Sequence, residues 1–331
     1  MGLKVARSLI ASLVAGNVVP MSASAAESST EYPGRPITLV IGEPPGAAAD
    51  VLGRQLAKHM AEDLGQPIII DFRAGASGNI GAAAVSRASA DGYTLFLASR
   101  PVTLHKKMYG HMDYDFARDL VPVGMAARLP FVLLMGNHVK ANSIQDAVDL
   151  ARDQPGKLVC ASNGIGTTNH MLCETLQEDA DVQMLHLPYK GVAPALADMI
   201  GGRADLLFTS LASAIPYLKS GVVRCVAVMS SARLPELPDT PSIEEFGFMK
   251  AEGNGWFAIV APARTPSHVI FRLNRSLNNV LAQENVREVL SSQGFVVPLS
   301  NNTQEALGTF MAEEALKWTE VLERRNITGV Q

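Results

Sequence analysis

The chain has 331 residues, of which 47% are hydrophobic and 18% charged, which is the composition of a globular protein with room for two domains. Its formal net charge of −4 at pH 7 and the lack of a basic stripe argue against nucleic acid as a partner. The sequence contains no CxxC pair and no His/Cys spacing typical of a metal site, and we expect neither a metal nor a cofactor.

The first 26 residues have the features of a secretory signal. Lys4 and Arg7 give a basic start, residues 9–19 are uncharged and mostly apolar, and Ala-Ser-Ala at 23–25 offers a cleavage site. The apolar stretch is about half of the roughly 20 residues that span a bilayer, which favours a cleaved signal over a retained anchor. We therefore expect residues 1–26 to be removed and the protein to work in the periplasm.

The next part of the chain predicts strands that alternate with helices. Leu52, Leu56, Met60 and Leu64 recur every four residues, as on one face of a helix, and Gly65 ends that helix. A second helix of small residues is expected at about 79–88. Three apolar runs predict strands, at residues 37–41, 67–72 and 93–98. This order of elements is typical of a parallel sheet.

The pattern restarts after Ser143, which is expected to cap a helix that runs to about residue 152. A helix to about residue 178 follows, and the next helix has Pro194 in its first turn. Further strands are predicted at residues 158–161, 184–187, 205–209 and 222–229. This second group of elements predicts a second α/β domain.

The last part of the chain returns to the first domain. Residues 256–260 predict a strand, Thr265-Pro266 begins a long helix, and residues 285–293 and 295–297 predict a helix and a short strand. The final helix has an apolar face, made of Leu307, Met311, Ala315, Trp318 and Leu322. We expect domain 1 to comprise residues 32–129 plus 250–331 and domain 2 residues 130–249, with a hinge near 129–131 and 250–255.

The three cysteines, Cys160, Cys173 and Cys225, leave at least one thiol unpaired within the chain. Their apolar neighbours favour the interpretation that all three are small buried hydrophobic residues. A disulfide between Cys160 and either Cys173 or Cys225 is the alternative.

Four loops that join a strand to a helix carry the functional prediction, at residues 42–46, 73–78, 162–168 and 188–191. In open α/β sheets, ligands bind beyond the carboxyl ends of the strands. Helix N-termini there present unpaired N–H groups and a partial positive charge, and glycine lets a ligand approach the backbone. The loops together predict a cleft for a small organic anion.

The same loops lie in stretches that resemble a known family. From residue 32 to about 321 the chain resembles the Bug/TctC family of periplasmic solute-binding proteins, which serve tripartite tricarboxylate transporters or act as orphan receptors. The stretches that carry the resemblance, all in the same order, are YPGRPITLVIGEPPGAAAD (32–50), LGQPIIIDFRAGASGNIGA (64–82), ADGYTLFLAS (90–99), ASNGIGTTNH (161–170), HLPYKGVAPALADMIGGRADLLF (186–208) and WFAIVAPARTP (256–266).

The resemblance implies an α/β fold of the two-domain periplasmic-binding-protein (Venus-flytrap) type, in which each domain is a mainly parallel sheet flanked by helices. It implies a protein that binds a small organic acid in the cleft between the domains and delivers it to membrane subunits of a tripartite tricarboxylate-type transporter. We expect this protein to be a monomer. The ligand-binding residues that it implies are Pro45, Gly46, Ala47 and Ala48, then Ala76, Ser77, Gly78 and Asn79, and in the opposite domain Ser162, Gly166, Thr167, Thr168 and His170, with Tyr189 and Asp205 near the far end of the ligand.

Three parts of the expected cleft depart from the family pattern. Residues 47–49 are alanines where a glycine and a hydroxyl residue are usual, which makes the wall more apolar. Glu43 replaces a common aromatic residue; we expect it to face solvent, and contact with a ligand amine is the alternative. Arg100 follows Ser99 at the end of a strand, so it either pairs with a second ligand carboxylate or lies on the surface. These changes favour an aromatic carboxylate or a dicarboxylate over a highly hydroxylated acid.

Three other functions compete with this interpretation. A nucleotide-dependent enzyme is disfavoured because residues 164–169 are one glycine short of GxGxxG and lack an acidic partner for a ribose. A serine hydrolase is disfavoured because Ser77 lacks the GxSxG spacing and His170 and His186 have no evident nucleophile. A receptor that signals to a membrane partner would use the same cleft, and the sequence does not separate it from a transport receptor. The chain is therefore predicted to be a binding protein and not an enzyme.

Overall fold

The computed structural model describes residues 1–2, 32–110, 112–248 and 253–328. The predicted signal at 1–26 lies outside the described residues apart from its first two, and so does most of the predicted hinge at 250–255. Within the described ranges, no helix combines the length and the apolar character that a membrane span requires.

The first sheet has the strand order β2-β1-β3-β10-β4. β1 pairs in parallel with β2 and β3, and β10 runs antiparallel to β3 and β4. In the described part of the chain, β10 is therefore the one strand of this sheet that runs opposite to the others. The strands are β1 (Ile37–Ile41), β2 (Ile68–Phe72), β3 (Thr94–Ser99), β4 (Leu120–Leu129) and β10 (Gly255–Pro262).

The second sheet repeats this arrangement with the order β7-β6-β8-β5-β9. β6 pairs in parallel with β7 and β8, and β5 runs antiparallel to β8 and β9. The strands are β5 (Phe131–Gly136), β6 (Val159–Ser162), β7 (Leu185–Pro188), β8 (Leu206–Ser210) and β9 (Val223–Val228). Each sheet is mixed, with its one reversed strand next to the edge.

The chain passes from the first sheet to the second at Pro130, between the end of β4 and the start of β5. Proline has no N–H and a fixed φ, so it interrupts the hydrogen-bonded ladder at the point where the strand changes sheets. The return after β9 leads to β10. The two-domain α/β fold predicted from the sequence is confirmed, whereas the domain limits of 32–129 with 250–331 and of 130–249 stay a prediction.

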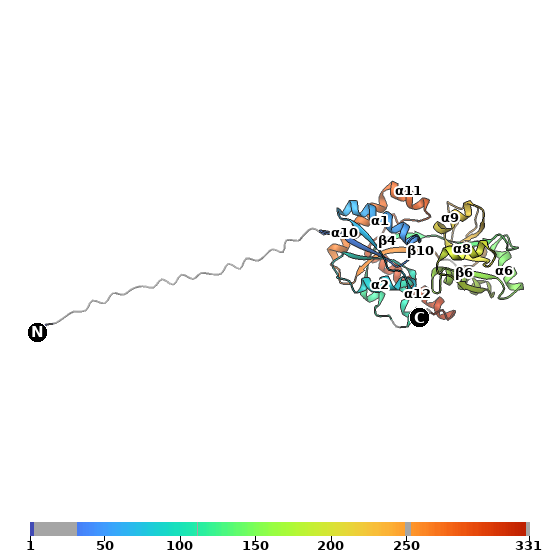
Figure 1. The fold of residues 1–331 in the computed structure, drawn as a ribbon, viewed down its shortest axis with the longest axis horizontal. Helices are drawn as coiled ribbons and strands as arrows, with labels where there is room; N and C mark the ends of the chain where they lie inside the picture. Colours follow the sequence, from blue (N-terminus) through green and yellow to red (C-terminus); the bar gives the residue numbers. More distant parts are fainter. Residues whose placement is uncertain (3–31, 111, 249–252, 329–331) are drawn as a thin grey trace. The chain divides into compact units, whose positions relative to one another are not determined.

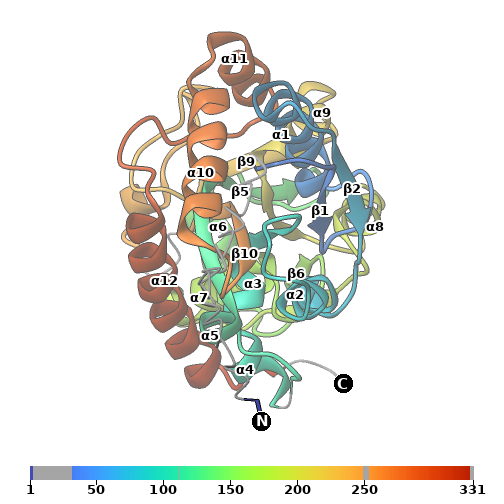
Figure 2. The same cartoon turned by 90° about the vertical axis from the view of Figure 1, so that its left-hand side faces the viewer.

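Helices cover both faces of the first sheet (Figures 1 and 2). On one face Ile41 and Leu97 lie under α1 (Ala48–Leu64), and α10 (Ser267–Ala282) packs beside α1 and against β4. On the other face Val40 and Phe96 lie under α2 (Asn79–Ser86), and α12 (Gln304–Arg324) packs against β4. Neighbouring strand residues thus point to opposite cores, which explains why these strands are apolar throughout.

The second sheet is also covered on both faces. Val132, Leu134 and Leu207 form a core with α8 (Val192–Ile200) and α9 (Leu211–Lys219). Leu133 and Phe208 belong to the core that includes α6 (Ile144–Asp153) and α7 (Thr168–Ala180). Ser143 caps α6 through a capping box with Asp146, as the sequence predicted.

Several elements were missing from the sequence prediction or wrong in it. Between residues 100 and 142 the sequence predicted only a crossing, and the structure has β4, β5 and three short helices there, α3 (Arg100–Thr103), α4 (His105–Tyr109) and α5 (Phe116–Asp119). The predicted strand at 295–297 is wrong, because Val296 alone pairs, in a bridge with Arg128. The remaining elements are η1 (Ala76–Gly78), η2 (Ile243–Phe246) and α11 (Glu284–Ser292).

Cys160 and Cys173 form a disulfide, and Cys225 is free. The preferred prediction that all three thiols are unpaired is therefore wrong for the first two, and one of the two alternatives holds. Cys160 lies on β6 and Cys173 on α7, which packs directly on β6, so the two Cα atoms come within 6.4 Å of each other.

Candidate functional site

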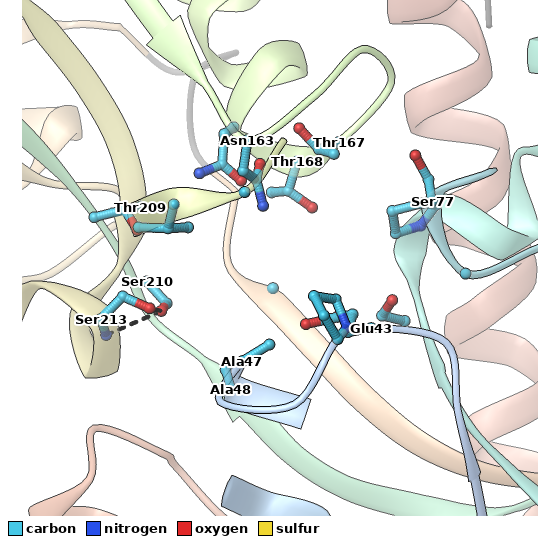
Figure 3. A pocket seen from close by; sticks show the side chains of 18 of the residues that line it. Glu43, Ala47, Ala48, Ser77, Asn163, Thr167, Thr168, Thr209, Ser210 and Ser213 are labelled. Carbon is cyan, nitrogen blue, oxygen red and sulfur yellow. Dashed lines mark hydrogen bonds between the residues drawn. The ribbon is translucent and has the colours of Figure 1, made fainter. Parts of the chain in front are cut away.

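A cavity of about 610 Å³ opens where strands of both sheets end, and it has the size of a small-molecule site. All four predicted loops contribute to its wall, together with the crossing strands β4, β5 and β10. Figure 3 shows Ser77 on one side of the space, Asn163, Thr167 and Thr168 on another, and Thr209 and Ser210 on a third. The loops that follow different strands are thus brought to one cavity, as parallel strand ends at one sheet edge require.

Ten of the predicted site residues line this cavity. They are Pro45, Gly46, Ala47 and Ala48 from the first loop, Ser77 and Gly78 from the second, Ser99 and Arg100 after β3, and Thr167 and Thr168 from the third. Their contact with a ligand stays a prediction. It requires first that these residues line one cavity, and they do.

Two other predicted residues, Asn79 and Ser162, are buried and do not line the cavity. Asn79 is buried and donates to the carbonyl of Ala76 at 2.6 Å. Ser162 donates to the carbonyl of Gly164 at 3.1 Å, and its Oγ lies 2.7 Å from Nε2 of His186. Because these side chains shape the second and third loops from behind, we assign them a supporting role.

His170 also supports the third loop from behind. Its Nδ1 accepts the N–H of Gly166 at 3.1 Å, and its ring stacks on His186 with centroids 3.8 Å apart. Burial is the largest of the effects that lower the pKa of His170 to about 3, and the charges of His186 and Arg325 contribute the rest. A neutral imidazole is what this geometry needs, since a protonated Nδ1 could not accept from Gly166.

Tyr189 and Asp205 were predicted near the far end of the ligand, and neither lines the cavity. Tyr189 donates its hydroxyl to Asp198 at 2.8 Å. Asp205 precedes β8, at the opposite end of that strand from the cavity, where its carboxylate accepts the N–H of Val159 at 2.7 Å. The direction of β8 therefore overturns the position expected for Asp205.

Arg100 is buried, which contradicts the interpretation that it lies on the surface. It is only 1% exposed, and its Nε donates to Oε2 of Glu314 on α12 at 2.9 Å. Its Nη1 donates to Oγ1 of Thr168 at 3.2 Å, its Nη2 to the carbonyl of Asn254, and the guanidinium lies 4.3 Å from the ring centroid of Trp318. Each of its three nitrogens thus has a protein partner, so Arg100 anchors the cavity wall.

Thr168 lines the cavity beside Arg100 and accepts a hydrogen bond from it. A guanidinium can only donate, so the Thr168 hydroxyl oxygen accepts and its own proton is left to donate. Ser213 is in a similar state, because its Oγ accepts from Ser210 at 2.9 Å. Both hydroxyls line the cavity and can donate to an anion.

Several helices begin at the cavity wall, and they differ in how their first N–H groups are satisfied. Thr167 and Ser210 cap α7 and α9 with their hydroxyl oxygens. The N-cap residues of α1, α2 and α8 are Ala47, Gly78 and Gly191, and no side chain at these caps accepts an N–H. The first turn of α2 is nevertheless satisfied, because the N–H groups of Asn79 and Ile80 donate to the carbonyls of Ala76 and Gly75. The first amides of α8 are left to attract an anion.

Glu43 lines the cavity, contrary to the expectation that it faces solvent (Figure 3). Its side chain is half-buried and its carboxylate accepts the N–H of Ala49 in the first turn of α1. Burial raises the pKa of Glu43 to about 7, because the charged form loses hydration, and the Ala49 hydrogen bond opposes this shift.

The sequence prediction missed several polar residues of the wall. Thr209, Ser210 and Ser213 come from the junction of β8 and α9, and Asn163 and Lys190 from the third and fourth loops. Thr209 and Ser210 end an apolar strand and precede a helix, which is the signal that identified the other loops. Oγ1 of Thr209 and Oδ1 of Asn163 are buried and have no hydrogen-bond partner among the described residues.

Replacing Thr168 with valine is expected to weaken carboxylate binding about ten- to hundredfold, since one hydrogen bond to a charged group contributes about 1.5–3 kcal/mol. The matched Thr168→Ser variant keeps the hydroxyl and should bind within about threefold of the wild type. Isothermal titration calorimetry with an acid that stabilises the wild type measures both. Equal affinities for the valine and serine variants would remove Thr168 from the site.

A family model described as "Tripartite tricarboxylate transporter family receptor" matches residues 52–327 of the chain. A protein of Pseudomonas sp. strain P51, named "UPF0065 protein in tcbD-tcbE intergenic region", is 34% identical over 96% of this chain and 95% of its own length. "Protein BugT" of Bordetella pertussis is 33% identical over 93% of each chain.

Solved structures with the same fold include three that cover nearly the whole chain. "R. palustris Rpa4515 with adipate" has a TM-score of 0.84 and 31% identity, and the match covers 90% of this chain and 100% of that one. The periplasmic binding protein BugD has a TM-score of 0.82 and 29% identity, again over 90% and 100%. "MatC (Rpa3494) from Rhodopseudomonas palustris with bound malate" has 0.80 and 27%, over 88% and 100%.

Proposed function

Because this chain belongs to the Bug/TctC family of tripartite tricarboxylate transporter receptors, it is a solute-binding receptor and not an enzyme, and we propose that it captures a small organic carboxylate in the cavity between its two sheets. The observation that carries the proposal is the convergence on one cavity of the uncapped N-terminus of α8 and of hydroxyls that are free to donate. Such groups replace the water around a carboxylate.

The magnitudes are sufficient for capture. Micromolar affinity corresponds to about 8 kcal/mol. Hydrogen bonds to a charged group contribute about 1.5–3 kcal/mol each, so about four of them, from Thr168, Ser213 and the first amides of α8, exceed the costs of association only if water is excluded. The crossing at Pro130 and the return to β10 are suited to a hinge that closes the cavity.

The wider role follows from the family. We propose that the segment 1–26 directs export, that the receptor works as a monomer in the periplasm, and that it delivers its ligand to the membrane subunits of a tripartite tricarboxylate-type transporter. The adipate and malate bound by two structural relatives support a small organic carboxylate as the ligand.

A thermal-shift screen of organic acids tests the proposal. An acid that binds only the folded state, and is present at one hundred times its Kd, stabilises the protein by about 2.7 kcal/mol. We expect at least one aliphatic or aromatic carboxylate to raise the melting temperature by several degrees, and calorimetry to give a single site. If a broad panel of mono- and dicarboxylates leaves the melting temperature unchanged, the proposed function is wrong.

A further inference from the structure

Glu43 stands on the wall of the proposed ligand cavity, directly after Gly42 at the end of β1 (Figure 3). Its carboxylate lies at the first turn of α1, where it accepts the N–H of Ala49. It is therefore held in place by the backbone, on the same wall that the N-terminus of α1 contributes.

No cation compensates this carboxylate within the described ranges. The charged groups around it are already paired or exposed: Asp50 on α1 with Arg54 at 2.6 Å, and Arg100 with Glu314 at 2.8 Å. Lys190 reaches the wall from the fourth loop, and its side chain is exposed. A half-buried carboxylate without a cation is costly unless a ligand supplies the positive charge or a proton does.

An acceptor on another part of the cavity wall lacks a donor. Oδ1 of Asn163 is buried on the opposite side of the cavity and receives no hydrogen bond from any described residue. Oγ1 of Thr209, which is fully buried, has no partner either. An ionised carboxylate can only accept, so a ligand made of carboxylates alone would donate no proton to Asn163 or to Glu43.

We propose that the receptor selects an organic acid that also bears an amino group, and that Glu43 binds the ammonium of this ligand while the hydroxyls and helix amides bind its carboxylate. This inference rests on the proposed function and names the ligand class within it. A plain dicarboxylate would place like charges together at Glu43 and would bind only with a proton taken up by the pair.

The test compares matched ligands on matched variants by calorimetry at pH 7.5. The probes are 6-aminohexanoate with adipate, and glutamate with glutarate. In the wild type we expect the preferred amino acid to bind at least about tenfold more tightly than its partner without the amine. Glu43→Gln should bring the ratio to within about threefold, and Glu62→Gln, which makes the same change at an exposed site on α1, should leave it unchanged.

Wild-type protein alone gives an independent measurement, which stays valid if Glu43→Gln folds poorly. Burial raises the pKa of Glu43 to about 7, so the carboxylate gains its charge as the pH rises from 6 to 8. Affinity for the amino acid should rise over this range, whereas affinity for the diacid should fall. Titrations in two buffers of different ionisation enthalpy should show proton release with the first ligand and proton uptake with the second.

The outcomes separate the inference from the proposed function. Diacids that bind at least as tightly as their amino partners, with a ratio that Glu43→Gln does not alter, would overturn the inference and leave carboxylate capture intact. If no acid of either kind binds the folded wild type, the proposed function itself fails.

Discussion

Replacing Arg100 with methionine is expected to destabilise the protein by about 3–5 kcal/mol, because the change leaves the carboxylate of Glu314 in a mostly buried site without its cation. It also removes the donor to the carbonyl of Asn254 and the cation that lies over Trp318. For a chain of this size the melting temperature should fall by roughly 10 °C. Urea unfolding gives the free energy, and a thermal melt followed by circular dichroism gives the temperature.

Two further variants show whether the buried pair is the cause. Arg35→Met removes an exposed arginine that pairs with Asp91 at 2.9 Å, and it should cost less than about 1 kcal/mol. Adding Glu314→Leu to Arg100→Met removes the stranded charge and should recover part of the stability. A melting temperature of Arg100→Met within about 2 °C of the wild type would contradict the anchoring role.

The same variant distinguishes an anchor from a ligand contact. If Arg100 paired with a second carboxylate, its loss would weaken a dicarboxylate far more than the matching monocarboxylate. All three guanidinium nitrogens have protein partners, so we expect both affinities to fall by a similar factor through the displaced Thr168. A selective loss for the dicarboxylate would show that the guanidinium reaches the ligand.

Replacing Gly42 with alanine is expected to abolish most ligand binding. An alanine Cβ there would lie 2.6 Å from Cα and 2.9 Å from the carbonyl oxygen of Gly78, closer than atoms of this kind approach. Gly78 has a φ of +92° and begins α2, so it cannot move without shifting that helix. The first two ligand loops would be forced apart, with a loss of at least about tenfold in affinity and about 1–3 kcal/mol in stability.

Gly308→Ala provides the matched control. Gly308 lies within α12, and its nearest neighbour to a new Cβ is Cγ of Pro122 at an ordinary 3.7 Å. Alanine lowers the entropy of the unfolded chain, so this variant should be more stable by about 0.5–1 kcal/mol and should bind normally. Wild-type affinity in Gly42→Ala would show that the two loops tolerate separation.

Local pattern was sufficient for most elements of the fold. The four-residue repeat of Leu52, Leu56 and Met60 and the glycine at position 65 predicted α1 and its end, and the structure confirms both. β4 and β5 were missed because a strand that joins two sheets carries no turn signal of its own beyond Pro130. The bridge at Val296 was mistaken for a strand because three apolar residues do not reveal whether a partner strand lies beside them.

The sequence by itself determined the order of strands and helices and the loops that form the cavity wall, because hydrophobic periodicity and glycine placement act over a few neighbouring residues. Only the tertiary structure decided where the charged side chains point. Arg100 binds Glu314, 214 positions later in the chain, and Glu43 meets the cavity because α1 begins beside it. The orientation of a buried charged side chain is set by the partner that the fold brings within reach. The neighbouring sequence does not identify that partner.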